Sequence, residues 1–350
     1  MRCLTLAEAL REQENECMFV CRPNDGNLID RISEQGFSVS VLPEYSEKIA
    51  VREKSGEVLK HAAWLGCDWQ IDAQHTLDAL ADKHPDWLVV DHYAIDARWE
   101  TVVLAANPGM RLLAIDDLAD RPHACHKLLD QNLGRKERDY ADLVPEYCRT
   151  LIGPKYALLR PEFAEWREYS LKRRQDPELK QLLLNMGGVD NSNATGMILN
   201  ALKQCPLPSD CRIVVIMGKT APFLESVKSV SESLPWSTEV RIDVDDMARE
   251  MAESDLAIGA AGSTAWERCC LGLPSFLIVL APNQAPSAKA LHDQGSAHWL
   301  GYTDTISERL PAKLESWRPE DELPRMTANA TTLTNGRGSR RLVHHLVGEA

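Results

Sequence analysis

The sequence lacks a long apolar segment, and this absence excludes one class of protein. No hydrophobic run approaches the ~18 residues that a transmembrane helix needs, so we expect no insertion into a membrane. Residues 1–16 turn acidic too early for a signal peptide, which favours a cytoplasmic location. Basic residues are in deficit, because 39 Lys and Arg stand against 52 Asp and Glu and give a net charge of -13. Since a nucleic-acid binder needs a basic face, nucleic acid is not an expected partner.

The sequence also lacks Cys-x-x-Cys pairs, although it has 10 cysteines. Without such pairs a zinc ribbon is not expected, and we interpret the cysteines as buried free thiols of a protein in a reducing compartment. His123, Cys125 and His126 form one candidate metal cluster, but no distinctive fourth ligand lies near them in the sequence. We therefore expect neither a metal nor a cofactor.

Length and composition indicate a soluble protein of two domains. The 350 residues exceed what one ordinary core accommodates. Hydrophobic residues make up 44% and charged residues 26%, which is typical of an ordered globular chain. A charged, proline-bearing stretch at 160–177 separates the halves, and we place the boundary there, with domains at 1–165 and 166–350. We expect a monomer or a weak dimer.

Short apolar segments alternate with amphipathic segments in both halves. The first half predicts strands at 17–22, 38–42, 87–90 and 111–115 and helices at 28–35, 70–83 and 99–106. The second half predicts strands at 180–186, 212–217, 239–242, 256–258 and 274–280, and helices from 193, at 246–253, at 264–271 and at 336–347. This alternation indicates an α/β fold of two doubly wound Rossmann-like domains with a helix at the end of the chain. Two such domains facing one another would enclose a cleft at the carboxyl ends of their sheets.

The chain opens on an amphipathic helix that begins at Met1. A doubly wound domain normally opens with a strand and a glycine-rich turn, and neither precedes this helix. We therefore expect that the first strand of the domain is missing from this sequence and that the chain starts late. We also expect the helix to dock on the amino-terminal sheet, because its apolar side needs a partner.

Three glycine-bearing segments lie at predicted strand-to-helix junctions. These are Gly187-Gly188, Gly262-Ser263-Thr264 and the weaker Gly218-Lys219-Thr220. Glycine lets a backbone approach a phosphate closely, and the following helix presents free N–H groups. The spacing of a P-loop is absent, and a structural turn is the alternative for any one segment, but two in one domain favour phosphate binding. Glu267 follows Thr264 by three residues, so it either accepts hydrogen bonds from a ribose diol or is a solvated charge.

Other polar residues follow predicted strands and carry weaker signals. Asp243 and Asp245 match the Asp-x-Asp pattern by which some glycosyltransferases hold a divalent metal, a pattern that is common by chance in an acidic chain. Asn283-Gln284 either orient a substrate or cap a turn. Asp91-His92-Tyr93 and Asp116-Asp117 end strands of the first half, and His92 is either a general base or incidental.

Several motifs, in their order, resemble one known family. They are Asp91-His92-Tyr93 with Trp99-Glu100, then 115–121, 129–132, 153–160, 187–190, 262–267, 272–274 and Asn283-Gln284. Together they resemble, across nearly the whole chain, the UDP-2,4-diacetamido-2,4,6-trideoxy-β-L-altropyranose hydrolases of pseudaminic acid biosynthesis. The second half also resembles the lipid-linked UDP-N-acetylglucosamine transferase of peptidoglycan synthesis, whose GT-B fold that family shares.

The resemblance implies a GT-B fold and hydrolysis of a UDP-linked diacetamido-trideoxy-hexose. Water would attack the anomeric carbon with inversion and UDP would leave, without a metal, because helix N-termini can stabilise the departing diphosphate. By matched motif, Tyr93 and Asn283 would lie at the reacting sugar. The UDP contacts that it implies are Gly187, Gly188, Val244, Met247, Gly262, Ser263, Thr264, Glu267 and Gln284.

Within this set the resemblance assigns separate roles. Gly262, Ser263 and Thr264 would hold the phosphates and Glu267 the ribose. Val244 and Met247 would meet the uracil, which displaces the metal interpretation of the Asp-x-Asp pattern around Val244.

The resemblance also has a gap. The family opens with a strand and a Gly-x-Gly-His turn whose histidine is its proposed general base, and this sequence begins after it, at Met1. His92 does not match that base. We therefore expect UDP binding by the second half, and hydrolysis only in a form that carries the turn. A related glycosyltransferase with a sugar or lipid acceptor, and a non-catalytic UDP-sugar binder, stay open as alternatives.

Overall fold

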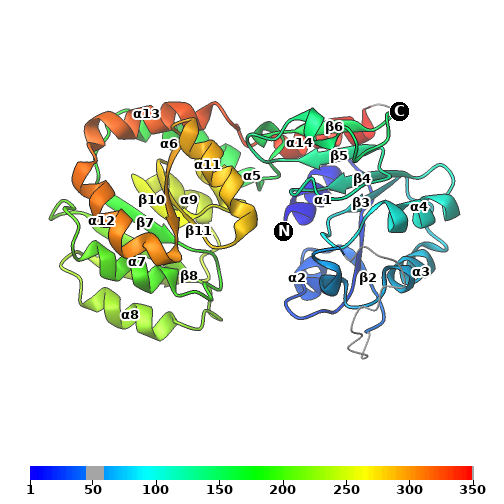
Figure 1. Cartoon of the computed structure of the whole chain (residues 1–350), viewed down its shortest axis with the longest axis horizontal. Coiled ribbons are helices and arrows are strands. Elements are labelled where there is room, and N and C mark those ends of the chain that lie inside the picture. Colours follow the sequence, from blue (N-terminus) through cyan, green and yellow to red (C-terminus); the bar gives the residue numbers. More distant parts are fainter. Residues whose placement is uncertain (45–58, 349–350) are drawn as a thin grey trace. The chain divides into compact units, whose positions relative to one another are not determined.

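A computed structural model describes residues 1–44 and 59–348 of the chain. The chain, which is coloured along its sequence in Figure 1, divides into two units. The first unit comprises Met1–Leu158 with Ser339–Ala350, and the second comprises Leu159–Gly338. Every strand pair in the described ranges is parallel. The predicted α/β fold with helices between parallel strands is therefore confirmed.

The second unit holds a six-stranded sheet in the order β12-β11-β10-β7-β8-β9. Its strands are β7 (Gln181–Asn185), β8 (Arg212–Met217), β9 (Thr238–Ile242), β10 (Leu256–Ala260), β11 (Ser275–Val279) and β12 (Ala297–Tyr302). The chain builds outward from β7 to β9, then crosses back to β10 and builds in the other direction. This is the doubly wound topology, and its switch point lies between β7 and β10.

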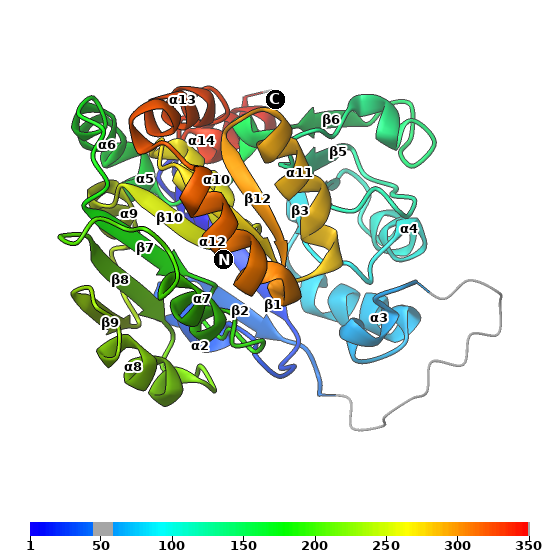
Figure 2. The ribbon, with the colours of Figure 1, turned by 60° about the vertical axis from the view of Figure 1, so that its left-hand side comes forward.

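Both faces of this sheet are buried, because helices cover each of them and side chains alternate along a strand. Leu182 and Leu184 of β7 share one buried cluster with Ile198 of α7 (Ala194–Leu202) and Leu310 of α12 (Ile306–Ser316). Figure 2 shows α7 and α12 side by side in front of the sheet. The other helices are α5 (Pro161–Glu165), α6 (Arg167–Arg173), α8 (Leu224–Glu232), α9 (Met247–Glu253), α10 (Thr264–Cys270), α11 (Ala285–Asp293) and α13 (Pro319–Thr331), with short 3₁₀ turns η4 (Pro282–Gln284) and η5 (Thr303–Thr305).

The described strands of the first unit fall into two sheets, β1-β2 and β3-β4-β5-β6. The strands are β1 (Met18–Cys21), β2 (Ser38–Val41), β3 (Trp87–Val90), β4 (Arg111–Ile115), β5 (Lys127–Asp130) and β6 (Arg149–Ile152). The helices are α1 (Arg2–Arg11), α2 (Ile29–Glu34), α3 (Trp69–Leu80) and α4 (Ala97–Ala106), with 3₁₀ turns η1 (Ala62–Leu65), η2 (Glu137–Tyr140) and η3 (Pro154–Tyr156).

Helix α1 docks on this unit as the sequence predicts. Leu6 and Ala9 pack with Leu113 and Ile115 of β4 on one side. On the other side Leu4 and Ala7 pack against the β1-β2 sheet. The helix therefore joins the two sheets through its two apolar sides.

The last helix, α14 (Gly338–Val347), corrects the predicted domain boundaries. The sequence places it in domain 166–350, but it belongs to the first unit. The reason is its apolar side: Leu342, Val343 and Leu346 pack on the β4–β6 face together with α1, as Figure 1 shows for the red helix beside β5 and β6. The indole N–H of Trp87 also donates to the Leu346 carbonyl at 2.9 Å. The second unit therefore ends at Gly338.

Two findings bear on the compositional predictions. All ten cysteines are free thiols and six of them are buried, as predicted. Among the helices of the described ranges, none combines the length and the apolar character that crossing a membrane requires.

Candidate functional site

The switch point of the second unit brings two of the predicted glycine loops together. Asn185 at the end of β7 pairs with Gly259 near the end of β10, so the segments that follow these strands are neighbours. Gly187 has φ +93°, a conformation that favours glycine. Gly218 closes the group, because its N–H donates to the Gly188 carbonyl at 2.9 Å and a Cβ there would collide with that oxygen. All three glycine segments therefore lie at the same edge of the sheet, at the carboxyl ends of β7, β8 and β10.

Both main loops leave backbone donors available. In the described part of the chain, the N–H groups of Gly187, Gly188, Gly262, Ser263 and Thr264 donate to no protein acceptor. Successive free N–H groups form a concave positive surface that suits an anion. The first turn of α7 is not part of it, because the Asp190 carboxylate accepts from the N–H groups of Ala194 and Thr195.

A buried arginine lies beneath the second loop. Arg268 is 2% exposed, and its guanidinium donates to the Ala260 carbonyl at 2.7 Å and to the Thr264 hydroxyl at 3.2 Å. Gly259 makes room for it, since a Cβ there would lie 2.6 Å from Nη1. No carboxylate of the described residues lies within ion-pair distance of Arg268. Burial lowers the pKa of this guanidinium to about 10, which still leaves it charged at neutral pH.

Glu267 lies one residue before Arg268, on the first turn of α10. Its side chain is half-buried, and burial raises the pKa of its carboxyl. The charge of Arg160 acts against that shift. Arg160 also donates to the Asp245 carbonyl at 3.4 Å, so it links the β9–α9 loop that contains Val244 to the neighbourhood of Glu267.

The residues after β11 and β9 have different surroundings. The side-chain Oε1 of Gln284 accepts from the Leu280 N–H at 3.0 Å, and the Nε2 of the same amide lies 3.6 Å from where a Cβ on Gly262 would be. Asn283 is exposed, and its side chain makes no hydrogen bond within the described ranges. After β9, Asp243 accepts from the Lys219 N–H at 2.9 Å, while Val244 and Met247 are half-buried.

In the first unit, Tyr93 follows β3 at the carboxyl end of the sheet. Its hydroxyl donates to Asp117 Oδ2 at 2.9 Å, and burial together with Asp117 raises the pKa of the phenol. Arg2 bridges Asp91 at 2.6 Å and Asp117 at 2.7 Å. His92 Nδ1 accepts from the Ala94 N–H at 3.1 Å, and burial lowers the pKa of His92, so its role in the structure is to fix this turn.

The candidate metal cluster of His123, Cys125 and His126 is not assembled. His123 Nδ1 lies 2.7 Å from a Glu100 carboxylate oxygen, whereas Cys125 contacts Cys148 at 3.5 Å between sulfur atoms. His126 accepts from the Leu112 N–H at 3.1 Å. The three side chains have separate partners, and no group of three or more His, Cys, Asp or Glu among residues 1–44 and 59–348 is arranged to hold a metal ion.

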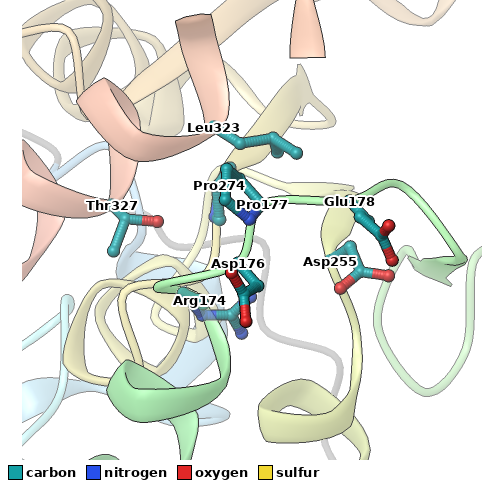
Figure 3. A pocket seen from close by; sticks show the side chains of 8 residues that line it. All are labelled: Arg174, Asp176, Pro177, Glu178, Asp255, Pro274, Leu323 and Thr327. Atoms are coloured by element: carbon teal, nitrogen blue, oxygen red, sulfur yellow. The ribbon is translucent and has the colours of Figure 1, made fainter. Parts of the chain in front are cut away.

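A small hollow lies elsewhere in the second unit. Figure 3 shows that Glu178, Asp255 and Pro274 line it, and these residues precede β7, β10 and β11. The hollow is therefore at the amino ends of the strands, the opposite edge from the glycine loops. Arg174 lines the hollow and donates to the backbone carbonyls of Leu271, Ser254 and Met251. These bonds hold three segments of the unit together, which indicates a structural role for Arg174.

Comparison with known proteins identifies the architecture. MurG of Acinetobacter baumannii covers 100% of this chain and 95% of its own, with a TM-score of 0.71 at 15% identity. Residues 187–343 match the glycosyltransferase family 28 C-terminal domain. The chain has the GT-B fold. The glycine loops at the switch point all lie within these matched residues.

Two curated relatives extend the likeness. The UDP-2,4-diacetamido-2,4,6-trideoxy-β-L-altropyranose hydrolase of Campylobacter jejuni is 26% identical over 286 residues, which are 82% of this chain and 89% of that protein. The spore coat polysaccharide biosynthesis protein SpsG of Bacillus subtilis is 31% identical over 161 residues, which are 46% of each chain. This match therefore spans less than half of SpsG. The resemblance to the altropyranose hydrolases that the motifs indicate is therefore confirmed.

Two site features were not predicted from the sequence. In the sequence Arg268 looks like an ordinary charged residue of a helix. The one signal for its position is Gly259 inside an apolar strand, because a glycine there indicates that another group lies close to the strand backbone. Arg160 ends a recognised motif, but only the fold brings it to the β9–α9 loop.

Proposed function

We propose that this chain binds a UDP-linked sugar and hydrolyses a UDP-linked diacetamido-trideoxy-hexose to free sugar and UDP, in pseudaminic acid biosynthesis. The observation that carries the proposal is the pair of adjoining loops at the switch point, each with free N–H groups, above a buried unpaired cation. Such a site suits a diphosphate. The likeness to the Campylobacter hydrolase over 82% of the chain supplies the reaction.

Each predicted residue has a role in this proposal. Gly262, Ser263 and Thr264, with Gly187 and Gly188, hold the diphosphate through backbone and hydroxyl donors. The remaining UDP contacts are Glu267 at the ribose, Val244 and Met247 at the uracil, and Gln284 beside Gly262. The charge that develops on the departing UDP is stabilised by these donors and by Arg268, so no metal is required.

Tyr93 and Asn283 are assigned to the reacting sugar. Because the Tyr93 hydroxyl already donates to Asp117, it acts towards a substrate as a hydrogen-bond acceptor. Asn283 keeps its donors and acceptor available. Water attacks the anomeric carbon from the side opposite the diphosphate, which inverts the configuration.

A glycosyltransferase is the second candidate. The match to the glycosyltransferase family 28 C-terminal domain favours it, because the same donor site can serve transfer to a sugar or lipid acceptor. A non-catalytic UDP-sugar binder is the third.

The UDP site is tested by the Glu267→Ala variant. Loss of a charged acceptor from the ribose should weaken UDP binding by about 1.5–3 kcal/mol in titration calorimetry. Glu225→Ala is the matched control, since Glu225 is an exposed carboxylate on α8 of the same unit. Unchanged UDP affinity in Glu267→Ala would remove this assignment. EDTA should leave the affinity unchanged, and loss that manganese restores would favour a metal-dependent transferase.

The reaction is tested by product analysis without any acceptor. The sequence contains no Gly-x-Gly-His turn, so we would assay this chain beside a chimera in which the strand and turn of the Campylobacter hydrolase precede Met1. Release of UDP and free sugar of inverted configuration from either protein supports hydrolysis. Turnover that appears only with an added acceptor supports the transferase, and UDP binding without turnover in both proteins supports the binder.

A further inference from the structure

Two cysteines of the first unit contact each other at the amino ends of neighbouring strands. Cys125 precedes β5 and Cys148 precedes β6, and their sulfur atoms are 3.5 Å apart although 23 positions separate them in the sequence. Among the other cysteines of the described ranges, no sulfur atom hydrogen-bonds to a second sulfur atom. This contact therefore sets one pair of thiols apart from the rest.

The backbone around this pair suits a disulfide bond. Strands β5 and β6 are parallel with Lys127 opposite Arg149, and the Arg149 N–H donates to the His126 carbonyl at 3.0 Å. Neighbouring strands lie about 4.8 Å apart, and a disulfide joins Cα atoms that are about 4.4–6.8 Å apart. Rotation of the two side chains can therefore bring the sulfur atoms to bonding distance while the strands stay paired.

The two thiols have different surroundings, which gives them different roles. Cys125 is fully buried in the apolar cluster of the sheet, whereas Cys148 is half-buried at the end of a turn, where its N–H donates to the Pro145 carbonyl at 2.9 Å. The hydrogen bond between the thiols lowers the pKa of Cys148, against burial and the charge of Glu100, and raises the pKa of Cys125. Since the thiolate is the reactive form, Cys148 is the thiol that reacts first with an oxidant from solvent.

We propose that Cys125 and Cys148 are an oxidation site, at which hydrogen peroxide converts the two thiols to a disulfide and a dithiol reductant restores them. The Cys148 thiolate attacks one peroxide oxygen and the O–O bond breaks, which leaves Cys148 as a sulfenic acid. The departing hydroxide takes up the proton that the Cys148 thiol had released and becomes water. The Cys125 sulfur then attacks the Cys148 sulfur, so the S–S bond forms, the S–O bond breaks, and the hydroxyl leaves with the Cys125 proton as a second water. The thiols lose two electrons in total, and the peroxide gains them.

The disulfide would close a loop that contains β5 and η2. This loop carries Asp130 and Tyr140, which hydrogen-bond to each other at 2.8 Å. A cross-link removes conformational freedom from the unfolded chain, so oxidation should stabilise the first unit and leave the second unit unchanged. The inference is independent of the proposed function, because the site lies within the first unit and its chemistry involves no nucleotide.

The test counts thiols and locates the bond in the whole chain. The reduced protein is treated with a small excess of hydrogen peroxide, unfolded and alkylated. Two of the ten cysteines should escape alkylation, and dithiothreitol should return both. Trypsin cuts after Lys127 and Arg135, between the two cysteines, so mass spectrometry of the digest should find the Cys125 and Cys148 peptides joined. In calorimetry the melting temperature of the first unit should rise by about 5–10 °C on oxidation.

Two variants separate this pair from the other thiols. In Cys148→Ser, peroxide should protect no cysteine from alkylation and should leave the melting temperature of the first unit where it is. Cys21→Ser is the matched control, because Cys21 is also half-buried in the first unit but contacts no other sulfur atom of the described residues. It should form the disulfide as the parent chain does.

Three results would overturn the proposal. They are alkylation of all ten cysteines in the peroxide-treated parent chain, oxidation of Cys148 to a sulfenic or sulfinic acid while Cys125 stays a thiol, and a bond from either cysteine to a third one. The peptide map of the parent chain distinguishes these results without any variant, so the proposal can be judged even if a substitution destabilises the fold.

Discussion

At the scale of single residues, Arg268 is the most unusual side chain of the candidate site. It is a buried cation that donates to the backbone and to a hydroxyl instead of to a carboxylate. A buried charge without a partner is costly, so a fold that keeps one gains something from it elsewhere. At this position the gain is positive potential directly behind the loop that we assign to the diphosphate, and a bound anion would offset the cost of burial.

This interpretation predicts opposite effects on binding and on stability. Arg268→Met keeps the volume and removes the charge, so UDP affinity should fall by about tenfold while uridine, which has no phosphate, binds as before. The free energy of unfolding without ligand should stay equal or rise, because a buried unpaired charge is gone. Calorimetry with both ligands and urea unfolding measure the two effects, and Arg268→Lys controls for the charge. An equal loss of uridine and UDP affinity would contradict the electrostatic role.

At the scale of elements, burial patterns in the sequence account for most of the fold. The strands predicted at 87–90, 111–115 and 212–217 coincide with β3, β4 and β8, because their apolar runs are bounded by turns or charges. β12 was missed, and so were β5 and β6. β5 and β6 each have four residues and begin with a charged side chain, Lys127 or Arg149, so the apolar part of each is too short to stand out. Their position depends on pairing, of β5 with β4 and of β6 with β5, and on the cover from α1 and α14, which are distant in sequence.

The candidate site also has a part that the sequence predicts and a part that it does not. The glycine loops were predictable, because glycine after a buried strand has a local meaning in an α/β chain. The positions of Arg268 and Arg160 were not, since each depends on a contact that the fold alone creates.

The ends of β4 and β5 share one buried polar network. The Tyr140 hydroxyl lies 3.0 Å from Asp116 Oδ2 and 2.8 Å from Asp130 Oδ2. Burial would raise the pKa of Asp116, but the charges of Arg121 and His123 and the hydrogen bonds from Ala119 and Tyr140 together hold this pKa below its ordinary value. Burial raises the pKa of Asp130 to about 6. Asp130 therefore holds its proton more tightly in the folded protein than in the unfolded chain.

This shift predicts a stability that improves on mild acidification. Because the folded pKa exceeds the unfolded one, the contribution of Asp130 is present below pH ~4 and is lost as the pH rises through about 6, a change of up to about 3 kcal/mol. In Asp130→Asn this part of the pH dependence should disappear from urea unfolding between pH 4 and pH 7.5. Asp142→Asn, an exposed aspartate of the same segment, should keep the parent slope. Parallel slopes for the parent chain and Asp130→Asn would count against the raised pKa.

At the scale of the whole molecule, the matched family domain and the folded units do not coincide. The glycosyltransferase family 28 C-terminal domain extends to residue 343, whereas the second unit ends at Gly338. The difference is the start of α14, whose Leu342 and Val343 are fully buried in the first unit. The last residues of the chain therefore complete the core of the first residues, which ties the stability of the first unit to a segment that follows the second.

This connection predicts where a mutation in α14 acts. Leu342→Ala removes a fully buried side chain from the cluster that contains Leu113, Leu129 and Leu151, so the free energy of unfolding of the first unit should fall by about 2–5 kcal/mol. Val347→Ala, on the same helix but 40% exposed, should cost less than about 0.5 kcal/mol. Hydrogen exchange measures both units in one sample: in Leu342→Ala the amides of α1, β4, β5 and β6 should exchange faster, and those of β7, β8 and β10 should keep their rates. Faster exchange in β7 and β10 with unchanged β4 would place α14 with the second unit, as the sequence alone suggests. The proposed UDP site lies in the second unit, so UDP affinity in Leu342→Ala should match the parent chain at temperatures where the first unit is still folded.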